Sequence, residues 1–168
     1  MTEHKSKKPK AIANASPIIC LSKAGLLDIT GKMYSQILIP PQVADEIAPD
    51  SKHAGISIEL LRFKWIEITP SFEIPPEIME WNLGTGESAV ISLALKYPAD
   101  EVLIDDRAAA RCARVYGLKI KGTLGILLDA KKQKIIPKVE PCLKKLIGAG
   151  LWISIDLQTK ILEISGEH

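Results

Sequence analysis

The sequence lacks the features that mark several large classes of protein. Among its 168 residues are three cysteines, an odd number with no C-x-x-C pair, so neither a disulfide framework nor a cysteine-based metal site is indicated. That usage suits a reducing, cytoplasmic setting. No stretch approaches the roughly 18 apolar residues of a membrane span, so we expect no membrane contact. Lys and Arg number 22 against 20 Asp and Glu, and a net charge of +2 provides no global field that would attract a nucleic acid.

Catalytic signatures built on histidine or on a phosphate loop are also missing. His4, His53 and His168 are far apart in the sequence, so no Ser-His-Asp or Cys-His arrangement is indicated. The Gly-Thr-Gly segment at 84–86 is not followed by Gly-Lys-Ser/Thr and is therefore not a phosphate loop. A phospho-receiver domain would carry its acidic pair after the first strand, whereas here the pair follows the fourth.

The remaining composition, 46% hydrophobic and 25% charged, is typical of a globular domain. Against a prior of roughly 150 residues per domain, the length predicts a flexible basic tail over 1–10 and a single domain over 11–168. Lysines before the mildly apolar stretch 11–21 resemble a secretory signal, but Asn14, Ser16 and Pro17 interrupt that stretch. We therefore expect no such signal.

Short apolar runs alternate with helical patterns, which is typical of a parallel sheet covered by helices. The strands are expected at Lys10–Asn14, Gln36–Ile39, Trp65–Ile68, Glu101–Ile104 and Leu118–Ile120. Helices are expected after a Ser16 cap, after Pro40-Pro41, from about Glu87 to Tyr97, from Asp105-Asp106 to Gly117, after a Thr123 cap, and over Val139–Ile147 and Asp156–Ile164. The prediction is an α/β fold, a three-layer α/β/α arrangement around a mostly parallel sheet of about five strands. Its C-terminal helices, from about 139, would pack on the flank of the sheet or form a dimer contact.

Ligands of open α/β sheets bind outside the carboxyl ends of the strands, and polar side chains gather there in this sequence. Asn14 ends the first predicted strand, Asp105 and Asp106 follow the fourth, and the helices carrying Glu46 and Glu87 begin on the same side. The pattern predicts an acidic cluster at one end of the sheet.

Glu87 is the most informative of these residues. Val90, Ile91 and Ala94 follow it at i+3, i+4 and i+7, which places its carboxylate on the apolar stripe of the helix. A first-turn glutamate stabilised by the helix dipole is the ordinary alternative, but it requires no inward direction. Because an inward carboxylate without a partner is costly, we favour a functional role.

Glu46 and the aspartate pair are weaker candidates when taken alone. Val43 and Ile47 define the core face of their helix, so Asp45 points to solvent and Glu46 lies on the flank of that face. An acidic residue near a helix start is also ordinary.

Of Asp105 and Asp106, one can cap the following helix while the other faces the crevice. Carboxylates gathered at one place repel each other unless a cation neutralises them. Oxygen ligands without clustered His or Cys favour Mg²⁺ or Mn²⁺ over zinc.

Arg107, Arg111 and Arg114, at i, i+4 and i+7, form one basic stripe beginning beside Asp106. Such a stripe is usually a solvated helix face. Arg107 lies nearest the acidic residues and could hold a substrate phosphate in a bidentate grip.

Taken together, these segments resemble the PIN-domain family, and within it the subgroup of toxin-like proteins that open with Asn-x-Ser-Pro. The segments that carry the resemblance are Asn14–Pro17, Ile39–Ile47, Leu83–Glu87, Leu103–Arg107 and Lys121–Gly125. The resemblance implies a metal-dependent ribonuclease using Mg²⁺ or Mn²⁺, with an antitoxin protein as partner and a homodimeric state. Its four acidic positions would fall on Asn14, Glu46, Glu87 and Asp106, with Asp105 adjacent and Ser16 beside the metal.

Asn14 departs from the family pattern, because most active PIN nucleases have Asp there. An amide oxygen can ligate Mg²⁺, but it brings no charge and cannot act as a base. Two hypotheses therefore stay open: an RNA endonuclease, and a catalytically weakened domain that binds RNA or a protein partner without cleavage.

Overall fold

A five-stranded sheet lies at the centre of the molecule. The computed structural model describes residues 7–47 and 62–167. Its strands are β1 (Lys10–Ala13), β2 (Gln36–Ile39), β3 (Ile66–Ile68), β4 (Glu101–Leu103) and β5 (Ile120–Lys121). Every pairing is parallel, and the order is β3-β2-β1-β4-β5, which confirms the predicted three-layer fold.

The burial of the strands explains their sequences. Strands at the centre of a parallel sheet are covered on both faces and read as continuous apolar runs. In β1, Ala11, Ile12 and Ala13 are all fully buried, whereas β3, at the edge of the sheet, is largely exposed. The central position of β1 is thus visible in its composition.

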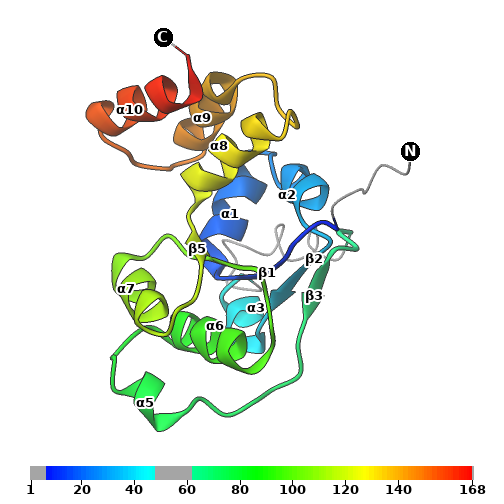
Figure 1. Cartoon of the computed structure of the whole chain (residues 1–168), viewed down its shortest axis with the longest axis vertical. Coiled ribbons are helices and arrows are strands. Elements are labelled where there is room, and N and C mark those ends of the chain that lie inside the picture. The colour runs from blue at the N-terminus through cyan, green and yellow to red at the C-terminus, as the bar shows by residue number, and fades with distance from the viewer. Residues whose placement is uncertain (1–6, 48–61, 168) are drawn as a thin grey trace.

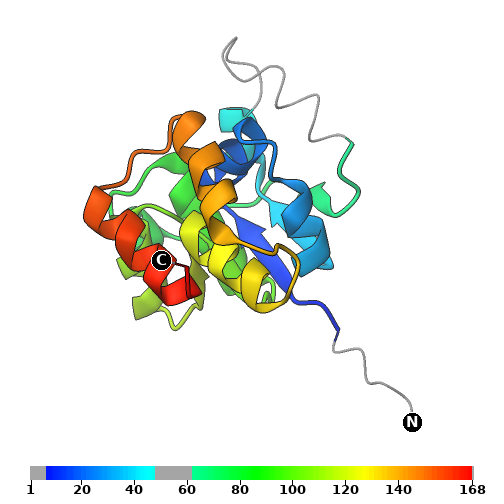
Figure 2. The same cartoon turned by 90° about the horizontal axis from the view of Figure 1, so that it is seen from above.

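Helices cover both faces of this sheet (Figure 1). They are α1 (Ala15–Lys23), α2 (Asp28–Met33), α3 (Pro41–Ile47), α5 (Pro76–Met79), α6 (Thr85–Lys96), α7 (Arg107–Val115), α8 (Thr123–Lys132), α9 (Val139–Gly148) and α10 (Ile155–Ser165). The connections β1 to β2 and β4 to β5 run in opposite directions across the sheet, so right-handed crossovers place α1 and α2 on one face and α7 on the other. Figure 2 shows α8, α9 and α10 together as an outer layer. None of the described helices is long and apolar enough to cross a bilayer.

Two predicted helix caps are wrong. α1 begins at Ala15, with Asn14 rather than Ser16 at the N-cap, and α8 begins at Thr123, with Gly122 at the N-cap. The physical reason is that the hydroxyls of Ser16 and Thr123 donate to the Asp105 carboxylate instead of accepting from their own helices.

The structure adds two short helices, α2 and α5, that the hydrophobic pattern did not predict. α2 owes its place to tertiary packing. The indole of Trp65 lies so close that a Cβ at Gly31 would be 2.6 Å from its ring, and Trp65 Nε1 donates to Thr30 Oγ1 at 3.0 Å. The hydrophobic pattern of the six residues of α2 does not reveal this contact with Trp65, so the sequence did not predict the helix.

A carboxylate clamp joins the C-terminal residues to the outer layer. Gly166, in the left-handed region with φ of 75°, ends α10 and turns the chain so that Glu167 reaches the start of α9. Glu167 Oε1 accepts from Lys131 Nζ and Val139 N, both at 2.7 Å, and Oε2 accepts from Glu140 N at 3.0 Å. Burial by itself would raise the pKa of Glu167, but these donors outweigh burial and hold the pKa at about 2.

Residues 1–6 of the predicted basic tail lie outside the described residues. Lys7 and Lys8, which are described, are exposed and lead into β1.

The Glu167 clamp predicts an acid-sensitive contribution to stability. Since the folded-state pKa of about 2 lies below the usual 4.5, the contribution is complete at pH 7 and is lost as pH falls from about 4.5 towards 2. We expect Glu167→Gln to lower the free energy of unfolding by about 1–3 kcal/mol at pH 7 and by much less near pH 2. Urea titrations at both pH values measure this, with Glu163→Gln, an exposed carboxylate on α10, as the control. An equal loss at both pH values would contradict the clamp.

Candidate active site

The site lies where the chain connections diverge at the carboxyl edge of the sheet. From β1 the chain moves outward to β2 and β3, then returns to β4 on the other side of β1. Asn14 follows β1 and its N–H donates to Leu103 O at 2.9 Å, so the residues that end β1 and β4 lie side by side. Crevices of this kind are where open parallel sheets bind ligands.

Asn14 has a buried polar atom that finds no partner among the described residues. The residue is 3% exposed, and its Nδ2 donates a long hydrogen bond of 3.4 Å to Glu87 Oε1. Its Oδ1 is buried and accepts nothing within the described part of the chain. Such an unpaired carbonyl costs about 1–3 kcal/mol, so a ligand that bound this oxygen would recover free energy.

Glu46 and Glu87 approach each other across α3 and α6. Gly86 lets Glu46 lie against the start of α6, because a Cβ there would collide with Glu46 Oε1 and lie 2.9 Å from its Cδ. Burial and then the charge of Glu87 raise the pKa of Glu46, against a hydrogen bond from the Gly86 N–H. The protein therefore holds two carboxylates together at a cost in electrostatic free energy.

The two aspartates after β4 have different partners. Asp105 Oδ1 accepts from Thr123 N at 2.7 Å, and its Oδ2 accepts from Thr123 Oγ1 at 2.7 Å and from Ser16 Oγ at 3.3 Å. Asp106 is the N-cap of α7, where its Oδ1 accepts from Ala109 N at 2.8 Å. One aspartate caps while the other joins polar residues at the crevice.

Of the predicted site residues, the structure thus brings Asn14, Glu46 and Glu87 into one group and Ser16 and Asp105 into a second. No hydrogen bond joins Asp106 to either group within residues 7–47 and 62–167. The assignment of Asp106 to catalysis or metal binding stays a prediction.

Sequence reasoning missed the role of Thr123, which was interpreted only as a helix cap. Thr123 holds the Asp105 carboxylate through two hydrogen bonds, and Gly122 leaves room for it, because a Cβ there would lie 2.9 Å from Asp105 Oδ1. The signal was present, since both residues belong to the Lys121–Gly125 segment that carries the family resemblance.

Cys20 is another neighbour of Asp105. Burial and the charge of Asp105 raise the pKa of its thiol, whereas a hydrogen bond with Ser16 lowers it.

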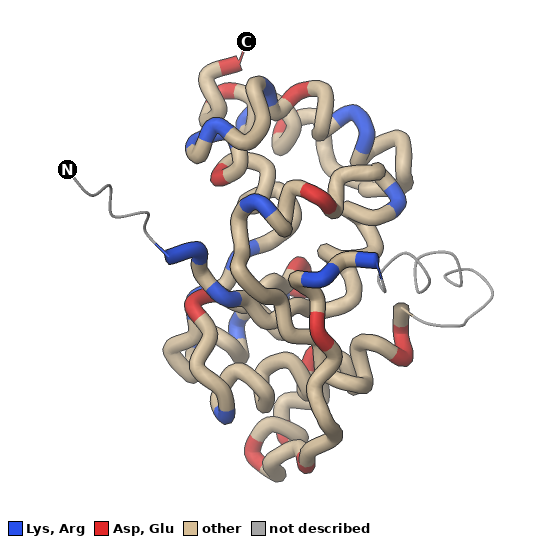
Figure 3. Tube along the Cα trace, turned by 90° about the vertical axis from the view of Figure 1, so that its right-hand side faces the viewer, with Lys and Arg blue, Asp and Glu red and all other residues tan. Residues whose placement is uncertain are grey.

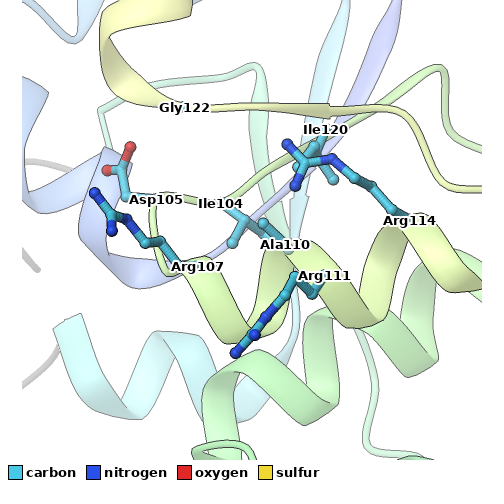
Figure 4. Close-up of a pocket in the computed structure, with 8 residues that line it drawn as sticks. All are labelled: Ile104, Asp105, Arg107, Ala110, Arg111, Arg114, Ile120 and Gly122. Atoms are coloured by element: carbon cyan, nitrogen blue, oxygen red, sulfur yellow. The ribbon is translucent and has the colours of Figure 1, made fainter.

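A groove of about 700 Å³ begins at Asp105 and runs between α7 and β5 (Figure 4). The predicted basic stripe lines it, and Arg107 extends towards Asp105. Elsewhere, basic and acidic positions are interspersed along the chain (Figure 3), so the positive charge of this groove is local.

A family model described as a PIN domain matches residues 10–167. The chain belongs to the PIN-domain family. PIN domains are generally nucleases that use divalent metals, and this chain has the corresponding fold. No curated protein gives a match to the sequence.

The metal that the family implies fits the side chains of this PIN domain. Among the described residues, no three His, Cys, Asp or Glu side chains are grouped closely enough to hold an ion, and all three histidines lie outside that part. Mg²⁺, however, keeps several waters and binds proteins through one or two carboxylates. Glu46 and Glu87 with the unpaired Asn14 Oδ1 are such a set of hard oxygen donors.

The Glu46–Glu87 pair predicts that removing one charge stabilises this PIN domain. In EDTA at pH 7, we expect Glu87→Gln to raise the free energy of unfolding by about 0.2–1 kcal/mol, since like charges destabilise by amounts comparable to exposed ion pairs. Glutamine keeps an oxygen for Asn14 Nδ2. In a Glu46→Gln background the same change should add nothing, which urea unfolding of the four proteins measures. Additive effects would contradict the repulsion, and Glu77→Gln on α5 is the control.

Proposed function

We propose that this PIN domain is a cytoplasmic, metal-dependent ribonuclease that cuts RNA phosphodiesters internally. The observation that carries the proposal is the buried Asn14, which contacts Glu87 through its Nδ2 and whose Oδ1 has no partner among the described residues, next to the mutually repelling Glu46 and Glu87. A divalent cation would give Asn14 Oδ1 a partner and neutralise the repulsion between Glu46 and Glu87. This group lies at the crevice where parallel sheets bind ligands.

Glu46, Glu87 and Asn14, with Asp105 and Asp106, would hold Mg²⁺ or Mn²⁺, directly or through water. Such an ion would supply Lewis-acid chemistry, namely the activation of a water for attack on the phosphodiester and the stabilisation of charge on the leaving oxygen. Glu46 can take up a proton more readily than an ordinary glutamate, because burial and the charge of Glu87 raise its pKa.

The remaining residues position the site and the substrate. Thr123 and Ser16 donate to both oxygens of Asp105 and fix its orientation. Asp106, by capping α7, sets the helix start from which Arg107 extends towards Asp105 (Figure 4). A guanidinium in that place suits a bidentate grip on the phosphate next to the cut.

The biological role that we propose is that of the toxin in a toxin–antitoxin pair, acting as a homodimer and held inactive by its antitoxin protein. This part of the proposal rests on the resemblance of the Asn14–Pro17 opening to toxin-like PIN domains. An antitoxin bound over the acidic crevice would block access of RNA to Glu46 and Glu87.

One observation favours a second candidate function, a PIN domain that binds RNA or a protein partner without cutting. Asn14 supplies an uncharged oxygen at a position where an aspartate would add a negative charge. With one charge fewer, the donor set attracts a divalent cation less strongly.

The ribonuclease proposal predicts the loss of cleavage in three isosteric variants. With Mn²⁺ and a labelled single-stranded RNA of mixed sequence, Glu87→Gln, Asp105→Asn and Asp106→Asn should each lower the cleavage rate at least 100-fold, as should EDTA. Glu77→Gln should cut like the wild type. Full activity of Glu87→Gln would refute the proposal, and full activity of Asp106→Asn would remove that residue from the site.

Restoring the acidic residue tests the weakened-domain alternative. If the site has lost its metal, titration calorimetry should detect Mn²⁺ binding by Asn14→Asp but none by the wild type, and cleavage should appear in the variant. If the amide suffices, as we propose, the wild type binds Mn²⁺ and Asn14→Asp tightens binding about tenfold or less. Binding by neither protein would refute a metal site at Asn14.

A further inference from the structure

The groove beside the acidic residues is joined to a second hollow with a different lining. The first has an apolar floor that includes Ala110 and Ile120, and the arginines of α7 along one side. The second, of about 550 Å³, is lined by Trp81, Leu83, Ala108 and Val115. Arg111 and Arg114 line both, so the two hollows are neighbours with these arginine side chains between them. The two hollows together are here called the α7 groove.

The arginines of the α7 groove form no ion pair with any residue that the structure describes. Their spacing over seven residues covers about 10 Å of helix. Their side chains diverge, with Arg107 extending towards Asp105, Arg114 towards Ile120, and Arg111 away from both (Figure 4). Guanidinium groups bind phosphates in bidentate geometry, so each of the three can take a separate phosphate.

Trp81 gives the α7 groove an aromatic surface. The side chain is 37% exposed beside Arg111 and Arg114, and its neighbour Val115 is 69% exposed. Asn82, in the left-handed region with φ of 50°, turns the chain between Trp81 and the Gly84–Glu87 segment of the site. A tryptophan with two guanidinium groups in one hollow is a stacking platform of the kind that binds unpaired bases.

We propose that the α7 groove binds single-stranded RNA, with phosphates on Arg111 and Arg114 and one base stacked on Trp81, a few nucleotides from the phosphate held by Arg107. The inference rests on the proposed ribonuclease function and adds to it a substrate path. An acidic peptide would use the arginines but gain little from an aromatic face. A base-paired strand offers no free base face for Trp81.

The test separates binding from cutting. Anisotropy of a 5′-labelled 12-nucleotide RNA of mixed sequence is measured in EDTA on the Glu87→Gln chain, which cannot cut. Arg111→Ala with Arg114→Ala should weaken binding more than tenfold and reduce the slope of log Kd against log salt concentration by about 0.7 for each phosphate that the protein no longer binds. Trp81→Ala should weaken binding about tenfold without changing that slope, and Trp81→Phe should retain most of the affinity.

Matched controls are Trp152→Ala, an 86% exposed tryptophan outside the groove, and Lys138→Ala with Lys160→Ala, two exposed lysines just before α9 and on α10. Both should bind RNA like the parent chain. The proposal is overturned if the arginine and Trp81 variants bind like the controls or if the RNA duplex binds as tightly as the single strand. It is equally overturned if a polyglutamate peptide binds as tightly as RNA and is unaffected by Trp81→Ala.

The same variants in the otherwise wild-type chain distinguish the two proposals. If the arginine and Trp81 variants still cleave RNA with an unchanged KM, the proposal that the α7 groove binds RNA is overturned and the ribonuclease proposal is unaffected. If the arginine and Trp81 variants lose affinity for RNA but the wild-type chain does not cleave RNA, the proposal for the α7 groove is supported and the ribonuclease proposal is refuted.

Discussion

The parallel pairing of β1 with β4 is the interaction on which the candidate site depends. Its register sets Ala13 opposite Leu103, so the chain leaves both strands at the same level, with Asn14 on one side and Asp105 on the other. These strands are neighbours in space only because the chain first builds β2 and β3 on the far side of β1. A slip of one residue would turn the polar side chains that follow away from the crevice.

The site is locally unfavourable, and the surrounding structure compensates. An unpaired buried carbonyl and two repelling carboxylates each oppose folding, as functional sites often do. Against them stand the fully buried central strands and well-paired contacts elsewhere, such as the Glu167 clamp on α9. The cost at the crevice is therefore understandable as preparation for a ligand.

The positions of the charged residues matter more in this protein than the net charge. With a net charge of +2 the molecule has no global attraction for RNA, yet a groove that begins at Asp105 is lined by three arginines that form no ion pair within residues 7–47 and 62–167. In the proposed ribonuclease, opposite local charges side by side suit a substrate that places phosphates on the arginines and one phosphate at the carboxylates.

The sequence by itself determined the parallel sheet, the carboxyl ends of its strands to within one residue, and the position of Glu87 on an apolar helix stripe. These follow from periodicity and composition over short windows. It also limited the aspartates to one cap and one crevice residue. Only the tertiary structure decided that Asp106 caps α7 while Asp105 accepts hydrogen bonds from Ser16 and Thr123, which therefore do not cap their own helices. It also decided that Gly86 must lack a side chain and that Trp81 lies beside the arginines of α7. Each of these depends on atoms brought together from different elements, and no local pattern records distances of that kind.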